Sequence, residues 1–368
     1  MDFDALYDRP IGYNLNKSAL LLNRVAAEMG CRSFQSVTRL QGGFNNFNYH
    51  VITEANNQFI IRISPTPKQL SSELCTLRQL KALRSNIPVP EVLWHSNSEW
   101  TDGFSVAAIS FVEGTLLSKM GHTLSEYDVK AISEQLGTIA ADIHSITFSD
   151  YGFLDENFHT KDSQDNYTSW TFDFLSSCLS NALLRERLGD KNCALLESCI
   201  TEHQHLLEAP RQPVLCHGDF NQKNILITKN GSNKRYTVTA ILDWEYALAG
   251  SAIMDIGNLF RYADRSDTIH PGFFASAYKE AKGHLSPHWQ DQSRFTDLLA
   301  LCAFLISPEE RPATYAHIID RIVLTLNHFM HSHAGAWERE DERTRGREGR
   351  EGREGREGRE GRKNVPLA

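Results

Sequence analysis

The residues with the clearest capacity for chemistry lie in CHGDFNQKNILIT, residues 216–228. Asp219 and Asn224 stand five positions apart in this otherwise apolar stretch, and Asp243 follows one strand later. Carboxylate and amide oxygens are ligands that Mg²⁺ prefers, and one Asp with one Asn beside a phosphate is a normal ligand set for it. The types and spacing of these residues therefore indicate a magnesium site that works beside a phosphate group.

A hairpin is the element that must close this site. The segments NILIT (224–228) and YTVTAIL (236–242) read as strands and flank a turn that contains glycine. Folding about that turn brings Asn224 close to Asp243, so that two oxygen ligands meet at the open end of the hairpin. Asp219 lies in a short loop before Asn224 and should face the same point. We therefore predict a metal site formed by Asn224 and Asp243.

Each of these residues also has a simpler interpretation. A single Asp or Asn in a turn makes local hydrogen bonds more often than it does chemistry, but the three residues together favour chemistry. His217 has the side chain of a general base, yet a histidine beside Gly and Asp more often positions a loop through a backbone hydrogen bond. We therefore predict a supporting role for His217.

A second set of residues lies nearer the start of the chain. Glu73 shares one face of a predicted helix with three leucines, Leu70, Leu77 and Leu80. A carboxylate within an apolar stripe requires a cationic partner, and Arg62 interrupts the apolar strand QFIIRIS. The predicted Arg62–Glu73 ion pair is either a structural brace or a device that aims Arg62 at phosphate oxygens.

Glycines in QGGFNNFNY, residues 41–49, lie between two predicted strands. Because Gly42 and Gly43 have no side chains, backbone N–H groups of this turn, which includes Asn45, can approach a phosphate. Gly-Gly in a hairpin is also commonly a simple turn. The sequence contains neither GxxxxGKS/T nor GxGxxG, which excludes P-loop and Rossmann nucleotide sites.

The surrounding pattern predicts two different lobes. Up to about residue 113 the chain alternates, with helices expected over 17–30 and 69–85 and strands over 36–64 and 106–114. The remainder is mostly helical and begins with a helix that opens at Ser125, in an S-x-x-D capping pattern closed by Asp128. Further helices are expected over 170–188, 191–207, 253–263, 273–282, 293–306 and 313–331.

These patterns predict an α+β fold in which a small antiparallel sheet lobe, residues 1–113, precedes a larger helical lobe, residues 114–335. Residues 336–368 form a third part, in which Gly-Arg-Glu repeats five times from Gly346. A glycine at every third position without apolar periodicity predicts a disordered tail. Both an electrostatic tether and a dispensable extension fit its alternating charges.

Composition limits the classes of function. Residues 339–368 hold ten Lys/Arg and eight Asp/Glu, a net +2, so the formal charge of −8 leaves −8 − 2 = −10 on the rest. A body this acidic is unsuited to nucleic acid and suits a cationic small molecule. Seven cysteines without a CxxC pair speak against a zinc ribbon or a disulfide framework. With no long apolar run and an acidic start, we expect a cytoplasmic monomer or homodimer without membrane contact.

In order along the chain, these features resemble the parts of a protein kinase. The segments CHGDFNQKNILI and AILDWEYALAGSAIMDIGNLF in particular resemble the aminoglycoside phosphotransferase and choline kinase family, from about residue 36 to residue 331. The resemblance implies a bilobal protein-kinase-like fold. Only ten residues separate Asp243 from the helix expected at Ile253, so a protein kinase's activation segment does not fit and a small-molecule substrate is expected.

The resemblance also implies a role for each matched residue. Asp219 would be the catalytic base, Asn224 and Asp243 would hold Mg²⁺, and Asp255 would brace the catalytic loop. Contacts to ATP or GTP would come from the following residues: Gly42, Gly43, Asn45, Arg62 with Glu73, Ile109, Phe111 and Val112. The chain departs from protein kinases in having Arg62 where they have Lys, and Trp244-Glu245 where they have Phe-Gly.

The acceptor is less constrained by the sequence. Acidic and aromatic side chains in residues 151–175, including Asp155 and Trp170, suit an amino sugar or amino alcohol, but fit a solvated loop equally well. Glu245 either faces a cationic substrate or caps the next turn. The leading hypothesis is a kinase for a hydroxyl of an aminoglycoside or amino alcohol. The alternatives are a metabolic kinase for choline, homoserine or a sugar, and a nucleotide-binding pseudokinase scaffold.

Overall fold

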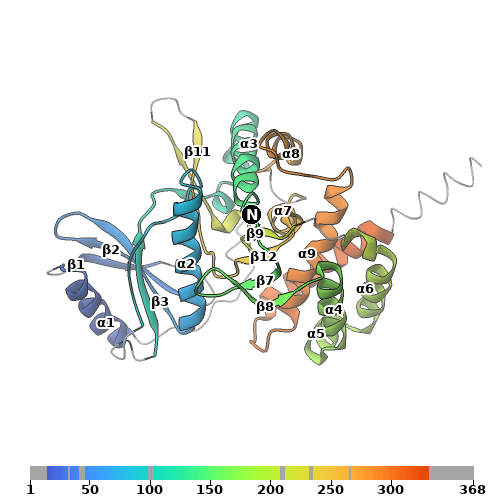
Figure 1. Ribbon diagram of the computed structural model, residues 1–368, viewed down its shortest axis with the longest axis horizontal. Helices are drawn as coiled ribbons and strands as arrows, with labels where there is room; N and C mark the ends of the chain where they lie inside the picture. Colours follow the sequence, from blue (N-terminus) through green and yellow to red (C-terminus); the bar gives the residue numbers. More distant parts are fainter. Residues whose placement is uncertain are drawn as a thin grey trace, which may run out of the picture.

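The structure is a computed structural model in which a sheet lobe and a helical lobe lie side by side (Figure 1). It describes residues 15–31, 34–40, 46–97, 101, 103–207, 212–231, 235–264 and 267–330. Within these ranges, no helix has the length and apolar character needed to cross a membrane. The α+β, bilobal arrangement is the one that the sequence predicts.

The sheet lobe contains one antiparallel sheet with two helices. Its described elements are α1 (Leu15–Glu28), β1 (Phe34–Arg39), β2 (Phe47–Thr53), β3 (Gln58–Ser64), α2 (Pro67–Leu83), β4 (Val92–Ser96) and β5 (Ser105–Ser110). The strand order is β1-β2-β3-β5-β4, and every neighbouring pair is antiparallel. The central strand β3 is therefore hydrogen-bonded along both edges, to β2 and to β5.

Alternation along β3 decides what each helix contacts. Phe59, Ile61 and Ile63 share a core with α1, whereas Ile60 packs into the core that includes the leucines of α2. Because successive side chains of a strand point to opposite faces, Arg62 lies on the same face as Ile60. The basic residue therefore faces the helix that carries Glu73, as the sequence predicts.

The helical lobe contains the remaining elements. Its strands are β6 (Thr115–Leu116), β7 (Tyr151–Leu154), β8 (Thr160–Gln164), β9 (Val214–Cys216), β10 (Ile225–Lys229), β11 (Tyr236–Ile241) and β12 (Leu248–Gly250). Its helices are α3 (Glu126–Ile143), α4 (Tyr167–Ser180), α5 (Ala182–Leu188), α6 (Asp190–His203), α7 (Ala252–Phe260), α8 (Pro271–Glu280), α9 (Trp289–Leu305) and a helix over 312–330. Short 3₁₀ turns lie at Leu117–Lys119, Gly121–Thr123, Gln204–Leu207 and Gln222–Asn224.

Helix α3 supports the hairpin that carries the candidate site. It begins with the predicted capping box, in which Ser125 accepts a hydrogen bond from the Asp128 N–H and Asp128 accepts one from the Ser125 N–H. Gln135 of α3 then bonds β11 twice, donating to the Tyr236 carbonyl and accepting from the Val238 N–H, both at 3.0 Å. The outer strand of the hairpin is thereby fixed to the helix.

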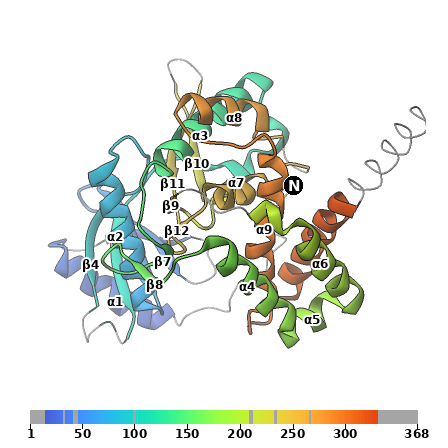
Figure 2. The ribbon, with the colours of Figure 1, turned by 45° about the vertical axis from the view of Figure 1, so that its right-hand side comes forward.

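Two hydrophobic cores divide the helical lobe. One is continuous with the α2 face of the sheet and runs through α3, the β10–β11 hairpin, α7 and α8. The other joins α4, α5, α6, α9 and helix 312–330, which gather away from the sheet lobe (Figure 2). Helix α7 packs against α9 and so links the first core, which contains the β10–β11 hairpin, to this second core.

The structure corrects several sequence predictions about the elements. The helix predicted over 170–188 is two helices, because Asn181 leaves the helical conformation and its side chain caps α5. Residues 151–164 form the β7–β8 hairpin, and this hairpin joins β12 and β9 in a four-stranded sheet. Strands β7, β8 and β12, like β4, are three to five residues long, too short for their periodicity to be visible in the sequence.

Candidate active site

The loop after β9 holds the Asp219 carboxylate between two amides. Asn221 donates its side-chain N–H to Asp219 Oδ1 at 2.7 Å, and Asn224 donates to Asp219 Oδ2 at 2.9 Å. Asn224 also donates to the Asp219 carbonyl at 2.9 Å. With one donor on each oxygen, the plane of the carboxylate is fixed before any substrate arrives.

His217 connects this loop to the end of β11. Its side chain is fully buried, and its Nε2 lies 2.8 Å from the Leu242 carbonyl while its Nδ1 accepts the Asp219 N–H at 3.2 Å. With Nε2 facing a carbonyl and Nδ1 facing an N–H, a neutral imidazole protonated on Nε2 satisfies both bonds. Both ring nitrogens are therefore engaged by backbone, which favours positioning over proton transfer.

Asp255 of α7 fixes the same loop from the other side. Its Oδ2 accepts the His217 N–H at 2.7 Å and its Oδ1 accepts the Gly218 N–H at 2.9 Å. His144, whose other ring nitrogen lies 2.9 Å from the Tyr278 hydroxyl, approaches Asp255 Oδ2 at 3.2 Å. The carboxylate is fully buried, so these bonds form where water does not compete.

The β10–β11 hairpin brings the two proposed metal ligands to one end. Ile225 pairs with Ile241, and the Leu242 N–H donates to the Asn224 carbonyl at 2.8 Å. Asp243 follows directly in the left-handed region, with φ +67°, which turns the chain out of the strand. The structure thus places Asn224 and Asp243 together at the open end of the hairpin, where the sequence predicts them.

Arg62 links the two lobes at this point. Its guanidinium forms an ion pair with Glu73, contacts Asp243 Oδ1 at 3.2 Å, and donates from Nε to Asn48 at 3.0 Å. Burial lowers the pKa of Arg62, but the charges of Glu73 and Asp243 outweigh it and raise that pKa. The guanidinium therefore carries its positive charge beside Asp243, the predicted metal ligand.

Glu245 lies on the sheet-lobe side of the site. It accepts a hydrogen bond from the side-chain N–H of Asn46 at 2.9 Å, and its charge contributes to raising the pKa of Arg62. Burial has the largest effect on the pKa of Arg62 and lowers it, whereas Glu245 raises it together with Glu73 and Asp243. Glu245 therefore faces Asn46 of the sheet lobe, on the side where the phosphates are expected.

The segment that joins the lobes contains the residues expected at the nucleotide base. Ile109 is buried in β5 opposite Ile60, while Phe111 and Val112 follow the strand and are half-buried. The Phe111 ring stacks on His50, with ring centroids 4.2 Å apart. The expected residues Gly42, Gly43 and Asn45 lie outside the described residues.

Asp155 and Trp170, the two substrate candidates of residues 151–175, have local contacts. Asp155 Oδ1 accepts the backbone N–H groups of Asn157 and His159, at 2.8 and 2.9 Å, in the β7–β8 turn. Trp170 is half-buried and packs edge-on against Tyr167. These contacts are local, and the segment is the β7–β8 hairpin and the first half of α4 instead of a loop.

The environment of Asp219 tunes its acidity. Burial raises the pKa of the Asp219 carboxyl, while the positive charge of Arg261 and the hydrogen bond from Asn224 lower it, and the net shift is upward. A carboxylate with a raised pKa is a stronger base than an exposed aspartate. The arrangement suits the removal of a proton from a hydroxyl group.

The proposed ligands fit a magnesium ion by chemistry. The Asn224 amide nitrogen is directed at Asp219, which turns its oxygen away from that carboxylate, and about a quarter (26%) of the Asp243 side chain is exposed. Another cluster with metal-binding residue types, His144, Cys216 and Asp255, is fully buried. Asp255 bonds the loop N–H groups and Cys216 donates to the Ser251 carbonyl at 3.3 Å, so this cluster serves the loop.

The chain is similar in sequence to known proteins. The model of the phosphotransferase enzyme family matches residues 36–291 of the chain. A subtelomeric hrmA-associated cluster protein of Aspergillus fumigatus is 33% identical over 129 residues. That match covers 33% of this chain and 24% of the fungal protein, so the chain spans about a quarter of this relative's length.

Solved structures share the fold. Aminoglycoside phosphotransferase APH(4)-Ia is 16% identical with a TM-score of 0.64, covering 85% of this chain and 99% of that one. A candidate fructosamine-3-kinase of Thermobifida fusca is 16% identical with a TM-score of 0.57, covering 83% and 98%. The GDP and kanamycin complex of APH(2")-IIIa is 17% identical with a TM-score of 0.56, covering 86% and 99%. The protein-kinase-like fold is therefore shared.

Sequence reasoning missed several residues that build the site. Asn46 and Asn48 contact Glu245 and Arg62, and His144 completes the bonds to Asp255. The register that pairs Asn48 with Arg62 across β2 and β3 was an available signal, since strands joined by a short turn place such residues opposite each other. For His144, 111 positions from Asp255, the sequence offers no such signal.

Proposed function

Because this chain belongs to the phosphotransferase enzyme family, we propose that it is a small-molecule kinase that transfers the γ-phosphoryl group of ATP or GTP to a hydroxyl group. The observation that carries the proposal is the meeting of Asp219, Asn224 and Asp243 at one end of the hairpin. In this proposal residues 1–113 bind the nucleotide and residues 114–335 supply the catalytic loop and the acceptor site.

Asp219 acts as the base. Its carboxylate, held by two amide donors, accepts the proton of the acceptor hydroxyl as the oxygen attacks the γ-phosphorus. Arg62 offsets negative charge on the phosphate oxygens, and Glu73 keeps its guanidinium in place. Most of the rate enhancement then comes from positioning and charge neutralisation, as in other phosphoryl transfers.

Asn224 and Asp243 hold Mg²⁺ in this proposal. When bound, the ion neutralises charge that develops on the transferred phosphoryl group. Two solved mutants of APH(4)-Ia support the joint role of Asp219 and Asn224, one with an Asp replaced by Ala bound to ADP and hygromycin B, the other with an Asn replaced by Ala bound to AMP-PNP and hygromycin B. The two replaced positions are five residues apart, which is the separation of Asp219 and Asn224.

The nucleotide base lies against Ile109, Phe111 and Val112 in this proposal. Relatives of known structure have been solved with adenine nucleotides and with GDP, so both bases fit the fold. The turn that contains Gly42, Gly43 and Asn45 is proposed to cover the phosphates. Competition between ATP and GTP for the same turnover measures which base the chain prefers.

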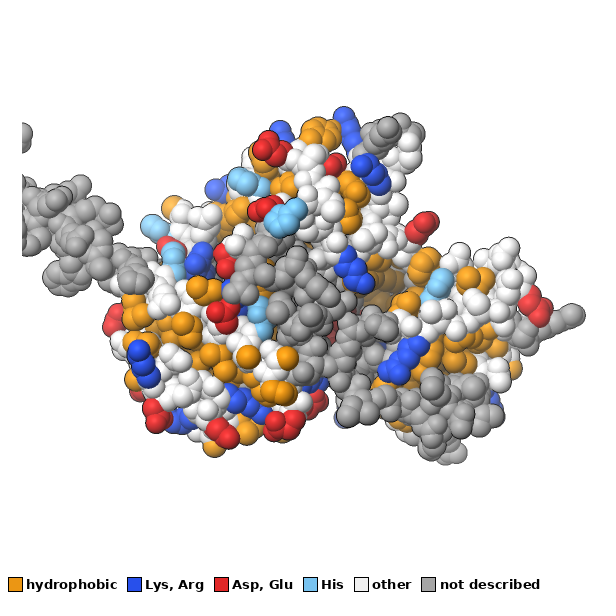
Figure 3. All heavy atoms as spheres, turned by 180° about the vertical axis from the view of Figure 1, so that it is seen from behind, with side chains coloured by type: hydrophobic (Ala, Val, Ile, Leu, Met, Phe, Trp, Pro, Cys, Tyr) orange, Lys and Arg blue, Asp and Glu red, His pale blue; other side chains and the backbone are white. Residues whose placement is uncertain are grey.

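A cationic acceptor, such as an aminoglycoside or an amino alcohol, is supported by the net charge of −8 and by the hygromycin B and kanamycin complexes of relatives. Figure 3 shows that, on the face it presents, Asp and Glu side chains are spread among Lys and Arg instead of gathered in one field. Overall charge therefore attracts such a molecule without defining where it binds.

Nucleotide turnover with and without acceptors tests the proposal. The full chain with Mg²⁺ should release ADP or GDP in the presence of an amino sugar or amino alcohol, and chelation of Mg²⁺ should stop it. Asp219→Asn should lower turnover by roughly 100-fold or more, whereas Asp173→Asn, on the exposed face of α4, should not change it. Nucleotide binding with no turnover of any acceptor would instead identify a pseudokinase scaffold.

A further inference from the structure

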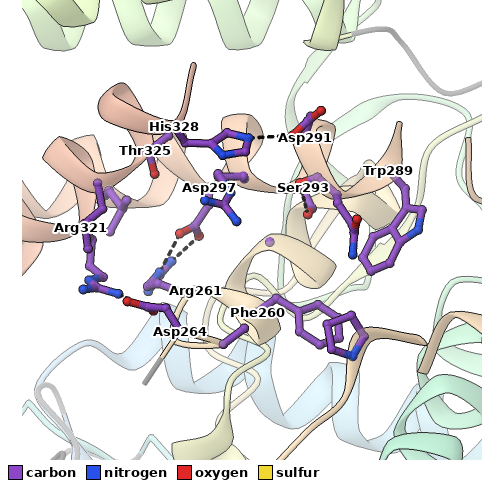
Figure 4. A pocket seen from close by; sticks show the side chains of 17 residues that line it. Phe260, Arg261, Asp264, Trp289, Asp291, Ser293, Asp297, Arg321, Thr325 and His328 are labelled. Carbon is purple, nitrogen blue, oxygen red and sulfur yellow. Dashed lines mark hydrogen bonds and ion pairs between the residues drawn. The ribbon is translucent and has the colours of Figure 1, made fainter. Parts of the chain in front are cut away.

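A cavity of about 300 Å³ lies in the helical lobe between α7, α9 and helix 312–330 (Figure 4). Phe260 and Trp289, with ring centroids 5.8 Å apart, form an apolar part of its lining. Arg321 and Asp264 lie across the cavity from Trp289 in that view. The lining therefore combines an apolar surface with a charged one, as small-molecule sites commonly do.

The cavity adjoins the catalytic loop. Helix α7 contributes Asp255 to the loop and, one turn later, Phe260 and the following Arg261 to the cavity. The segment after α7 is tied to the loop as well, because Thr268 donates to Gln222 at 2.8 Å. The cavity is therefore joined to the loop of the proposed base through α7 and through the Thr268–Gln222 bond.

The carboxylates that line the cavity already have cationic or donor partners. Arg261 binds Asp297 through two bonds of 2.6 and 2.8 Å, Arg321 binds Asp264 at 2.7 Å, and His328 approaches Asp291 at 2.8 Å. With Arg294, the lining contains three arginines and three aspartates. Its net charge with His neutral is therefore 3 − 3 = 0. A polycation gains little from a lining that is already neutral.

One buried donor in the lining is unsatisfied. The Arg321 side chain is 4% exposed, and its two terminal nitrogens donate to Asp264 and Asp320. Its Nε has no hydrogen-bond partner among the described residues. A buried N–H without a partner is costly, so a ligand oxygen at this place is favoured. The exposed Arg294 adds a second guanidinium to the lining.

The lining also keeps capacity for a positive group. Asp264 and Asp291, although paired, retain 51% and 47% of their side chains exposed. An ionised carboxylate accepts more than one hydrogen bond, so these two can receive an ammonium group from the solvent side. The cavity therefore presents donors for an oxyanion in its buried part and acceptors for an ammonium group at its rim.

We propose that this cavity binds the non-reacting part of the acceptor and that the acceptor carries an oxyanion, a carboxylate or a phosphate, in addition to its ammonium group. The inference rests on the proposed function for the reaction at the hydroxyl. This narrows the cationic acceptors of the proposed function from polycationic aminoglycosides to hydroxylated ampholytes of modest size.

Two pairs of acceptors that differ in the oxyanion test the inference. Homoserine is compared with 3-aminopropan-1-ol, and glucosamine 6-phosphate with glucosamine, while kanamycin serves as the polycation. For the full chain, kcat/KM should be roughly 10-fold or more higher for the oxyanion member of one pair, as expected for one bond to a charged group. The pair that responds tells whether the oxyanion is a carboxylate or a phosphate.

Variants connect the preference to the cavity. Arg294→Ala removes an exposed guanidinium, and Arg321→Lys keeps the charge but removes the Nε–H. Both should lower kcat/KM by roughly 10-fold for the preferred oxyanion acceptor and leave its partner without the oxyanion unchanged. Arg185→Ala, an exposed arginine of α5 outside the cavity lining, is the matched control. Calorimetric titration of the Asp219→Asn protein measures the same binding without turnover.

The outcomes separate this inference from the proposed function. If both members of each pair are phosphorylated equally well and neither arginine variant alters the ratio, the inference is overturned and the kinase proposal stands. If no acceptor supports turnover but the Asp219→Asn protein binds an oxyanion member and Arg294→Ala abolishes that binding, the kinase proposal is overturned and the cavity still binds the oxyanion. Failure of the Asp219→Asn protein to bind either oxyanion member also overturns the inference.

Discussion

Replacement of Asp255 by Asn tests how the catalytic loop is held. The carboxylate accepts the N–H groups of His217 and Gly218 on different oxygens, at 2.7 and 2.9 Å, and meets His144 at 3.2 Å. An amide has one oxygen, so in Asp255→Asn at least one of these backbone N–H groups faces an NH₂ group instead of an acceptor. The change leaves the volume of the side chain almost the same.

The magnitude follows from that loss. A hydrogen bond to a charged group contributes about 1.5–3 kcal/mol, and a buried donor left without a partner costs about 1–3 kcal/mol. Part of this is offset because the variant no longer buries a charge. We therefore expect the free energy of unfolding to fall by about 2–4 kcal/mol.

In Asp255→Asn, kcat/KM should fall by more than the loss of folded protein explains. Asp219 directly follows Gly218, so a shift of the loop displaces the proposed base, and a displacement of about 1 Å costs on the order of 100-fold in rate. Denaturant unfolding measures stability, and kcat/KM from nucleotide release measures activity, at a temperature where the variant is folded. Asp128→Asn, in the capping box of α3, is the control and should cost under about 1 kcal/mol. If Asp255→Asn matched the wild type in both measurements, the bracing role of Asp255 would be refuted.

Three further predictions follow from the same geometry. Because a base must be ionised and burial raises the pKa of Asp219, kcat/KM should decline on the acid side at a higher pH than an exposed aspartate allows, which a profile over roughly pH 4–8 measures. Arg62→Lys should raise KM for the nucleotide roughly 10-fold, since one ammonium cannot hold Glu73, Asn48 and a phosphate together; an unchanged KM would contradict this role. Gly218→Ala should lower the free energy of unfolding by at least about 2 kcal/mol, because φ is +81° and a Cβ would lie 2.2 Å from the Tyr246 carbonyl oxygen. Gly231→Ala, where a Cβ meets open space, is its control in denaturant unfolding and should change stability by well under that amount.

The fold was predictable where local patterns are long. The capping box at Ser125, the leucine face of α2 around Glu73 and the strands of the β10–β11 hairpin follow from periodicities of 3.6 and 2 residues, which a single sequence displays. The short strands β4 and β12 were missed because three to five residues carry too little periodicity. They are defined by the strands on which they pair.

The candidate site was predictable to the extent that its residues are close in sequence or joined by one turn. Asn224 and Asp243 meet because a hairpin places its two ends together, and Arg62 meets Glu73 because a strand and the next helix share a face. Asn46 with Glu245, 199 positions apart, and His144 with Asp255 meet through packing between distant elements. Their spacing in the sequence therefore carries no information about the contact.

The sequence by itself determined the family: the residue types and spacings of the loop after β9 and of the hairpin predict a phosphotransferase, which the family match confirms. The magnesium site that they also predict stays a prediction. The tertiary structure alone decided how that chemistry is held and what adjoins it. Only there do α7, α9 and helix 312–330 form a cavity with three Asp–cation pairs, and only there is the Arg321 Nε left without a partner. The physical reason is that acid–base and metal chemistry depend on residue type, whereas pairing, burial and cavity shape depend on which distant surfaces pack together.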